Sequence, residues 1–490
     1  MKSASAAAIA STLPTAGRAA PTEGMELLMK HDGVGLGALV RSGEVKPREL
    51  VEATIQVIET LDEKINAIPV RDFERALDRA DSILPQGPFA GVPFSVKDTA
   101  NVAGLPTAVG NKFFANRIPK QSHGLVRLYE AAGLIVVGKS NLPDMSLIPT
   151  TEGGSYGTCR NPWNLDYSTG GSSGGAGASV AAGYTPLAHG TDGAGSIRIP
   201  ASHCGVFGLK PGRDRILSAN STPRFAFDHV LSRTVRDSAL SLAVTQDRSP
   251  DIRLERMGFI QGPSVRRLKI GYLRNGYTEP ATPDVVEAID ATARLCEGLG
   301  HEVIEAKQII DRDQYEANYI ALYAGKFLKT RKLIEKTTGQ PVSKSGLMTK
   351  FTARFGDQAE GLGSDDLDAA RRYFDDLDIR YNSWLTSYDV VLSPVTYAPP
   401  PRLGFLFDDD EEFEVVSRRV FDYLGYTSPQ NVLGLPSMSV PLHISKDGLP
   451  IGSHFATKYG QEPMLLELAY ELEAAQPWAG KWAPKSIASL

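Results

Sequence analysis

Apolar positions fall at helical spacing in some stretches of the chain and in short continuous runs in others. Helical spacing predicts helices over residues 47–65, 73–83, 122–132, 283–299 and 364–386. Apolar runs rich in β-branched residues predict strands over 91–96, 134–140, 301–306 and 389–394. Because strands and helices alternate, we expect an α/β fold, in which a large, mostly parallel mixed and twisted sheet is covered by helices on both faces.

Residues at the ends of these segments support their bounds. Pro47 suits the first turn of a helix, where its missing N–H is not needed. Ser122 is a candidate cap for the helix that follows it, and Gly133 is a candidate stop for the same helix. The end of the strand at 91–96 is followed directly by Lys97, at the position where α/β folds often carry reactive groups.

No linker or internal repeat divides the 490 residues. We expect a single domain over 26–490, preceded by a disordered N-terminal tail, residues 1–25, that is rich in Ala, Ser, Thr and Pro. The apolar stretch at 6–10 is shorter than the ~7–15 residues of an export signal's apolar region. We therefore expect a cytoplasmic protein.

Composition and charge exclude several classes of partner. The chain is 42% hydrophobic and 22% charged, with a formal net charge of −5, so neither nucleic acid nor an anionic membrane surface is expected to bind it. No apolar run approaches the ~18 residues of a membrane span, so no membrane is expected as a partner. The three cysteines, an odd number, favour buried free thiols in a reducing compartment.

The candidate chemistry lies in two glycine-rich turns and one lysine. Ser172 and Ser196 are 24 positions apart, and Lys97 precedes Ser172 by 75 positions. A serine hydroxyl is a weak nucleophile unless a base takes its proton. No histidine is placed to form the usual pair with either serine, whereas Lys97 is available. The pattern indicates a serine hydrolase that works through lysine.

The turn around Ser196 is suited to stabilise negative charge on a carbonyl oxygen. Backbone N–H groups can converge there because Gly193, Ala194 and Gly195 have small side chains or none. We expect these three residues to form an oxyanion hole. Asp192 and Arg198 flank the turn, and we expect them to fix its shape rather than to take part in catalysis.

Other interpretations of the same residues are weaker. The GGSSGG block does not end as a phosphate-binding loop does, since Ala176 follows Gly175, and taken alone it is as well explained as a structural turn. Cys204 lacks a paired base and is expected to be a small buried residue. The eight histidines show no metal-binding spacing, so we expect neither a metal nor a cofactor.

Three segments resemble the amidase signature family: GVPFSVKD around Lys97, GGSSGGAGASVAAG around Ser172, and GTDGAGSIRIPASHCGVFGLKP around Ser196. Both intervals between the three residues agree with the family, and the third segment is similar to a sub-group that hydrolyses aminohexanoate cyclic dimers. The resemblance implies the amidase signature fold. It places a signature core at about 90–215 and a variable substrate-pocket region at about 310–425.

The resemblance also implies a role for each matching residue. Ser196 would be the nucleophile that forms an acyl-enzyme, Ser172 would bridge it to the base after a cis bond from Gly171, and Lys97 would be the base. The resemblance further implies that Ser173 hydrogen-bonds within this network and that Ser146 contacts the bridging serine and the substrate. Thr151 lies in the segment 150–154, which we expect to contribute to the substrate pocket. The expected partner is thus a small-molecule amide substrate, and a homodimer is one option for assembly.

Two conditions follow for this set of residues. Lysine has a pKa of ~10.4 in water, so Lys97 must lose its proton before it can act as a base. Burial among apolar residues such as Val92, Phe94 and Val96 is expected to lower its pKa. The family more often has glycine where this chain has Ala194, and alanine fits there only if its φ is not positive.

The leading hypothesis is an amidohydrolase that cleaves the C–N bond of a small-molecule, aryl or oligomeric amide. Esters and carbamates share acyl-transfer chemistry, so urethanase activity belongs to the same hypothesis. One alternative is a glutaminase subunit of a tRNA-dependent amidotransferase, which would use the same three residues. The other is a catalytically inert binding module on the same scaffold.

Overall fold

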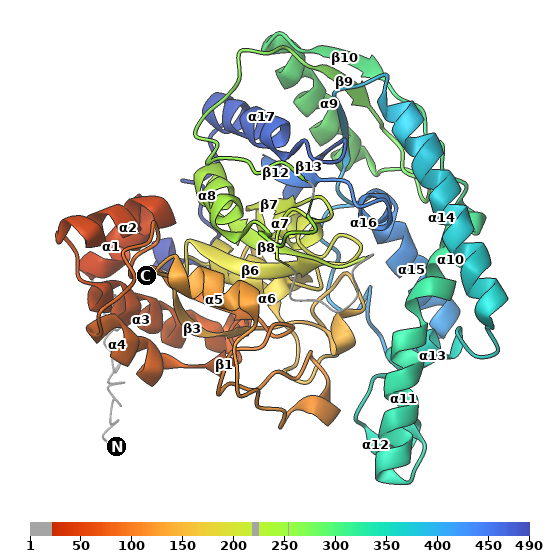
Figure 1. Cartoon of the computed structure of the whole chain (residues 1–490), viewed down its shortest axis with the longest axis horizontal. Coiled ribbons are helices and arrows are strands. Elements are labelled where there is room, and N and C mark those ends of the chain that lie inside the picture. The colour runs from red at the N-terminus through yellow and green to blue at the C-terminus, as the bar shows by residue number, and fades with distance from the viewer. Residues whose placement is uncertain (1–21, 218–224, 253) are drawn as a thin grey trace, which may run out of the picture.

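One sheet of eleven strands runs through the protein, whose computed structural model describes residues 22–217, 225–252 and 254–490 (Figure 1). In spatial order the strands are β1 (Val70–Arg71), β3 (Ile135–Ser140), β2 (Pro93–Lys97), β6 (Leu187–Asp192), β8 (Phe227–Ser232), β7 (Phe207–Lys210), β12 (Ser437–Ile444), β13 (Pro450–Thr457), β11 (Val390–Pro394), β9 (Lys269–Tyr272) and β10 (Glu302–Glu305). A separate two-stranded sheet pairs β4 (Arg160–Asn161) with β5 (Asn164–Ser168).

The sheet is mixed, and its parallel pairs form two groups. Strand β2 runs parallel to β3 and β6, and β9 runs parallel to β10 and β11. The strands between these groups pair antiparallel, from β6 through β8, β7, β12 and β13 to β11. Parallel neighbours need a crossover, and helices supply it. In chain order, α5 (Gly124–Ala131) follows β2 and precedes β3, and α9 (Pro283–Gly298) joins β9 to β10. The connection from β2 to its other parallel neighbour, β6, runs through α5, β3 and α6 (Gly174–Ala181).

Helices cover both faces of the sheet, as the sequence predicted. On one face, α6 and α7 (Arg198–Cys204) pack against each other and bury small and branched side chains such as Ala176, Ile197 and Leu231. On the other face, α8 (Val235–Thr245), α9 and α17 (Glu462–Ala475) cover a cluster that includes Leu209 and Met438. The structure thus has the predicted large mixed sheet with helices on both faces.

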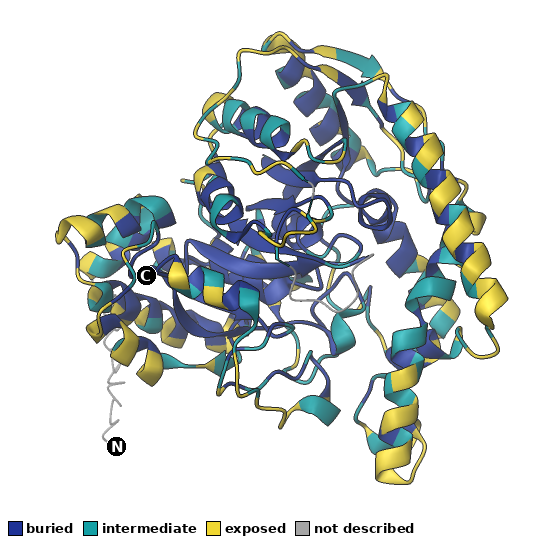
Figure 2. Ribbon diagram, viewed as in Figure 1, coloured by how far each residue is buried: buried dark blue, intermediate teal, exposed yellow. Residues whose placement is uncertain are grey.

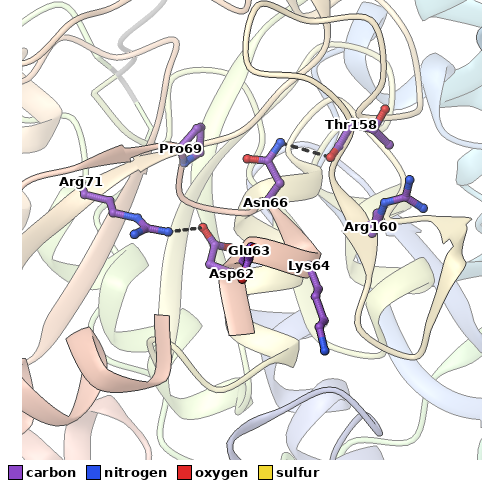
Figure 3. Close-up of a pocket in the computed structure, with 8 residues that line it drawn as sticks. All are labelled: Asp62, Glu63, Lys64, Asn66, Pro69, Arg71, Thr158 and Arg160. Atoms are coloured by element: carbon purple, nitrogen blue, oxygen red, sulfur yellow. Dashed lines mark hydrogen bonds and ion pairs between the residues drawn. The ribbon is translucent and has the colours of Figure 1, made fainter. Parts of the chain in front are cut away.

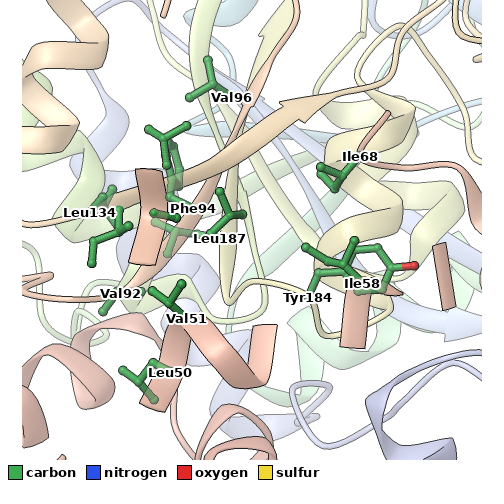
Figure 4. Packing of buried hydrophobic residues seen from close by; sticks show 14 of the residues in the cluster. Leu50, Val51, Ile58, Ile68, Val92, Phe94, Val96, Leu134, Tyr184 and Leu187 are labelled. Carbon is green, nitrogen blue, oxygen red and sulfur yellow. The ribbon is translucent and has the colours of Figure 1, made fainter. Parts of the chain in front are cut away.

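Four N-terminal helices pack beside the first strands: α1 (Glu23–Lys30), α2 (Gly33–Ser42), α3 (Pro47–Ile65) and α4 (Phe73–Asp81). Apolar residues of α3, including Leu50, Val51 and Ile58, meet Phe94 and Val96 of β2 in one buried cluster (Figure 4). The helix begins at Pro47 because proline suits the first turn, and it buries the face that the apolar spacing predicted.

A group of helices from residue 312 onward lies along one side of the molecule in Figure 1. Its members are α10 (Arg312–Tyr323), α11 (Gly325–Thr338), α12 (Val342–Ser345), α13 (Lys350–Asp357), α14 (Ser364–Leu385), α15 (Phe413–Leu424) and α16 (Ser428–Val432). Aromatic rings fill the space between these helices, and Tyr315, Tyr319 and Phe327 are buried there. Figure 2 shows that the outer sides of α11 and α14 are exposed. Three short 3-10 helices complete the described elements: η1 (Lys112–Phe114), η2 (Asp144–Ser146) and η3 (Ile487–Ser489).

Most segment bounds predicted from the sequence agree with the structure to within a few residues, but two details differ. Helix α5 is capped by His123, whose Nδ1 accepts a hydrogen bond from the Leu125 N–H at 3.3 Å, while Ser122 Oγ accepts instead from the Ala103 N–H. The predicted tail at 1–25 falls outside the described residues up to residue 21, and α1 already begins at Glu23. Within the described ranges, no helix is both long and apolar enough to cross a bilayer.

Candidate active site

Lys97 is the last residue of β2, and its side chain is fully buried. Side chains alternate along a strand, so Lys97 and Ser95 point to one face of the sheet while Phe94 and Val96 point to the other. Val92, Phe94 and Val96 belong to one buried cluster with residues of α3, and Figure 4 shows Val92 and Phe94 near Val51. These three residues were expected to surround the amine, but the alternation places them on the opposite face.

Three hydroxyl groups surround the amine of Lys97 instead. Its Nζ lies 2.8 Å from Ser172 Oγ, 2.9 Å from Ser173 Oγ and 2.8 Å from Thr191 Oγ1. In the described part of the chain, no carboxylate is hydrogen-bonded to this amine. The structure thus brings Lys97 and Ser172 together as the sequence predicted, and it adds Thr191 from the end of β6.

The protonation of this amine follows from its surroundings. Burial is the main cause that lowers the pKa of Lys97, to about 7. The negative charges of Asp192 and Asp228 oppose the shift, and the positive charge of Lys326 adds to it. At neutral pH roughly half of the amines therefore carry no extra proton, and those can accept one.

The turn that carries Ser172 is held from the preceding loop. The Gly171–Ser172 peptide bond is cis, as the family resemblance implied. Thr151 Oγ1 donates to the Gly170 carbonyl at 3.0 Å and accepts from the Gly174 N–H at 3.1 Å. A Cβ on Gly174 would lie 2.1 Å from that same oxygen, so only glycine fits there. We expected Thr151 to contact the substrate or oxyanion, but its side-chain oxygen is used to hold this turn.

The turn that carries Ser196 is joined to the first one by the backbone. The Ser173 N–H donates to the Ser196 carbonyl at 3.2 Å. Gly195 has a φ of +138°, and a Cβ there would lie 2.4 Å from Thr427 Oγ1. That hydroxyl donates to the Ala194 carbonyl at 2.6 Å. Ala194 itself does not adopt a positive φ, which meets the condition for alanine at this position.

A buried ion pair fixes the shape of the same turn. Asp192 accepts hydrogen bonds from the Gly195 N–H at 2.6 Å and the Ile197 N–H at 3.0 Å. The Arg198 guanidinium contacts both carboxylate oxygens, each at 2.9 Å. Burial acts to raise the pKa of Asp192, but Arg198 outweighs it and holds the pKa well below its usual range. Both residues thus lie where they can hold the turn, the role expected for them from the sequence.

The three residues expected to form an oxyanion hole differ in what their amides do. The Gly195 N–H is directed at Asp192 and is not available for a substrate. Within the described residues, the N–H groups of Gly193 and Ala194 make no hydrogen bond. Ser146, also expected near the substrate, has a φ of +56°, and its buried Oγ lacks a partner in the described ranges.

Other candidate groups are accounted for by burial. All three cysteines are buried free thiols, and burial raises the pKa of Cys204 well above its usual value, which excludes a thiolate there at neutral pH. His189 pairs with Asp228 at 3.1 Å, and both ring nitrogens of His203 lack partners in the described part of the chain. No cluster of metal-ligating side chains occurs among the residues that the structure describes.

Four residues near the site were not assigned a role from the sequence, although Tyr323 and Lys326 fall within the region at about 310–425 that was expected to form the substrate pocket. Thr191 lies inside the segment GTDGAGS, so its strand position was a usable signal. Thr427 reaches the Ser196 turn from 233 positions away. The Tyr323 hydroxyl lies 3.2 Å from where a Cβ on Gly193 would be, and Lys326 is close enough for its charge to act on Lys97. No local motif marks the last three, because only the fold brings them to the site.

The molecule also has a cavity that is separate from this site. It has a volume of about 560 Å³, lies at the end of α3 (Figure 3) and is lined by Asp62, Glu63, Lys64, Asn66, Pro69, Arg71, Thr158 and Arg160. Asp62 in this cavity accepts hydrogen bonds from two backbone N–H groups, so its carboxylate has a structural role. None of the eight lining residues belongs to the predicted site.

Comparison with known proteins places this chain in a family. The sequence model of the amidase family, described as "Amidase", matches residues 49–466. The 6-aminohexanoate-cyclic-dimer hydrolase of Pseudomonas sp. (strain NK87) is 32% identical over 483 residues, which cover 92% of this chain and 96% of that protein. The acylamidase of Rhodococcus erythropolis is 32% identical over 469 residues, covering 92% and 97%.

Solved structures agree with the sequence comparisons. A 6-aminohexanoate cyclic dimer hydrolase has a TM-score of 0.83 and 30% identity, with 92% of this chain and 98% of that chain covered. A bacterial aryl acylamidase of the amidase signature family has a TM-score of 0.80 and 25% identity, covering 92% and 97%. The chain therefore belongs to the amidase signature family and is a hydrolase that acts on amide bonds.

Proposed function

We propose that the protein hydrolyses a small-molecule, aryl or oligomeric amide through Ser196, Ser172 and Lys97 and passes through an acyl-enzyme. The observation that carries this proposal is the fully buried Lys97 amine, which has a pKa of about 7 and lies 2.8 Å from Ser172 Oγ. A neutral amine in contact with a hydroxyl is the arrangement that a serine hydrolase without histidine needs.

In the proposed first half-reaction, neutral Lys97 takes the proton of Ser172 while Ser172 takes that of Ser196. The Ser196 Oγ then forms a bond to the carbonyl carbon, and the negative charge moves to the carbonyl oxygen. The N–H groups of Gly193 and Ala194 are the proposed donors to that oxygen, since that of Gly195 is held by Asp192. Each such donor contributes about 3–4 kcal/mol to transition-state stabilisation.

The same proton path then runs in reverse. The proton returns from Lys97 through Ser172 to the substrate nitrogen, the C–N bond breaks, and the amine leaves with the acyl group bound to Ser196. Water attacks this ester and gives a proton through Ser172 to Lys97. The bond between the acyl carbon and Ser196 Oγ then breaks, the proton returns through Ser172 to Ser196, and the acid is released. Amides need the protonation step most, because an amide anion is a very poor leaving group. Esters, anilides and carbamates could enter the same cycle, and their ranking depends on the substrate pocket.

A fluorophosphonate probe tests the nucleophile directly, since only an activated serine reacts readily with it. We expect one equivalent of label, located on Ser196 by peptide mass spectrometry. Ser196→Ala should lose the label and at least about a thousandfold of para-nitroanilide turnover. Ser387→Ala, at an exposed serine after α14, is the matched control and should retain both. A Ser196→Ala enzyme with a tenth of the wild-type rate would disprove the assignment.

A substrate panel separates the alternatives raised by the sequence. Turnover of anilides, esters or carbamates without glutamine hydrolysis supports the proposed function. Glutaminase activity of the purified chain, without turnover of the other substrates, would instead support a subunit of a tRNA-dependent amidotransferase. A chain that neither reacts with the probe nor turns over any substrate would be an inert module.

A further inference from the structure

Lys326, the second residue of α11, is a half-buried cation beside aromatic rings. Its Nζ lies 4.0 Å from the ring centre of Tyr323 and 4.7 Å from that of Phe327. Within the described part of the chain, no carboxylate forms an ion pair with this amine. Arg331 on the same helix differs, because it pairs with Asp357 at 3.2 Å.

Two observations relate Lys326 to the turn that carries Ser196. Tyr323, whose ring lies beneath the Lys326 amine, has its hydroxyl 3.2 Å from where a Cβ on Gly193 would be. Gly193 is one of the two proposed donors to the carbonyl oxygen. The positive charge of Lys326 also acts on the buried Lys97 amine. An amide bound at Ser196 would therefore extend along the side of the site that this lysine occupies.

A cation in this position discriminates among substrates by charge. The two rings hold the ammonium in place by cation–π attraction, and they keep part of the surrounding water away, which strengthens its interaction with an anion. A substrate that carries a positive charge would be repelled. A substrate that carries a carboxylate would provide the counter-ion that this part of the chain lacks.

We propose that Lys326 is a specificity residue that binds a carboxylate of the substrate, so that the enzyme prefers anionic amides to neutral amides of the same size. This inference rests on the proposed function. It makes Lys326 a group that binds substrate and not one that moves a proton. The preference should be about tenfold in kcat/KM, as expected of a single partly buried ion pair.

Two substrate pairs test the proposal. The first pair tests charge on the acyl side. The mono-para-nitroanilide of glutaric acid carries a carboxylate, and the para-nitroanilide of 5-methylhexanoic acid is its neutral counterpart of the same size. The second pair tests charge on the amine side: para-acetamidobenzoate and para-isopropylacetanilide. The wild type is compared with Lys326→Met, Lys326→Arg and Lys332→Met, the last at an exposed lysine of the same helix. Rates are measured at about pH 9, where Lys97 is unprotonated, so that its titration does not affect the ratio.

We expect at least one pair to show a preference of about tenfold for the anion, which Lys326→Met removes and which Lys326→Arg and Lys332→Met retain. Protection of Ser196 from the fluorophosphonate by the same compounds measures binding without turnover, and it should show the same ratio. If Lys326→Met leaves both ratios unchanged while neutral amides are still hydrolysed through Ser196, the inference is wrong and the proposed function stands. If the wild type labels at Ser196 but cleaves no amide, the proposed function fails, and the protection ratio alone decides whether Lys326 binds carboxylates.

Discussion

The Nζ atom of Lys97 lies 2.8 Å from the Oγ atom of Ser172, although 75 positions separate the two residues in the sequence. The contact forms because β2 ends at Lys97 and runs parallel to β6, while α6 begins just after Ser172. Both side chains are buried, so bulk water does not compete for the hydrogen bond between them. Four predictions follow from the groups around this contact.

The activity should depend on pH through Lys97. Since burial lowers the pKa of Lys97 to about 7, we expect kcat/KM for a neutral anilide to rise with pH and level off above that value. Below it, activity should fall by about tenfold per pH unit, because the protonated amine cannot accept a proton. Lys97→Arg should be inactive over the whole range, since arginine stays protonated. A profile that is flat between about pH 5 and 9 would contradict the assignment of Lys97 as the base.

The stability of the fold should also depend on pH through the same amine. The pKa of Lys97 is about 7 in the folded chain and 10.5 in its ordinary state, so between these values the unfolded chain binds more protons. The free energy of unfolding of the wild type, relative to Lys97→Met, should therefore rise with pH by about 1.4 kcal/mol per unit within this window. Urea titrations of both proteins from about pH 7 to 9 measure the difference. A difference that does not change with pH would show that the folded amine is not perturbed.

A side chain at position 195 should impair the enzyme, whereas removal of the Ala194 side chain should have little effect. Gly195 has a φ of +138°, and a Cβ there would lie 2.4 Å from Thr427 Oγ1. We expect Gly195→Ala to lower the free energy of unfolding by about 1–3 kcal/mol and kcat/KM by at least about a hundredfold. Ala194→Gly, the matched change at the adjacent position, should keep kcat/KM within about tenfold of the wild type. Equal decreases in kcat/KM for the two variants would mean that the positive φ of Gly195 is not required for activity.

Asp192 should be required for folding as well as for the turn. Asp192→Asn would leave the buried guanidinium of Arg198 without a carboxylate, and we expect the free energy of unfolding to fall by about 3–5 kcal/mol. Glu52→Gln removes one of the two exposed carboxylates that pair with Arg48, and this ion pair should contribute less than about 1 kcal/mol. Urea denaturation of the two variants provides the comparison. A similar decrease in the free energy of unfolding in both variants would show that the buried Asp192–Arg198 pair contributes no more to stability than an exposed pair does.

Much of the local structure could be predicted from apolar spacing. Helices α3, α9 and α14 and strand β11 occupy nearly the predicted residues, because their apolar positions repeat at 3.6 or in short continuous runs. The cap of α5 was missed because a histidine ring nitrogen took the role that serine more often has. The antiparallel strands between the two parallel groups leave no local signal, since strand direction is set by partners far away in the sequence.

For some residues of the candidate site the sequence predicted both identity and role, and for others only identity. Lys97, Ser172 and Ser196 were proposed from glycine-rich turns, a lysine at a strand end and a family resemblance. The sequence did not predict the hydrogen bonds of Thr151 and Gly195, because a motif does not show that the Thr151 hydroxyl is bonded to the Gly170 carbonyl or the Gly195 N–H to Asp192. The direction of the Lys97 pKa shift was predicted, but its surroundings were assigned to the wrong face of the strand.

The family, the order of helices and strands, and the available chemical groups follow from the amino-acid sequence, because each depends on residues close together in the chain or on a recognisable motif. Three relationships arise only in the folded chain: hydroxyls surround the Lys97 amine, Thr427 donates to the Ala194 carbonyl in the Ser196 turn, and the charge of Lys326 acts on Lys97. Hydrogen bonds and charges act over a few ångströms in space, and the chain brings such groups together only after its strands have paired and its helices have packed.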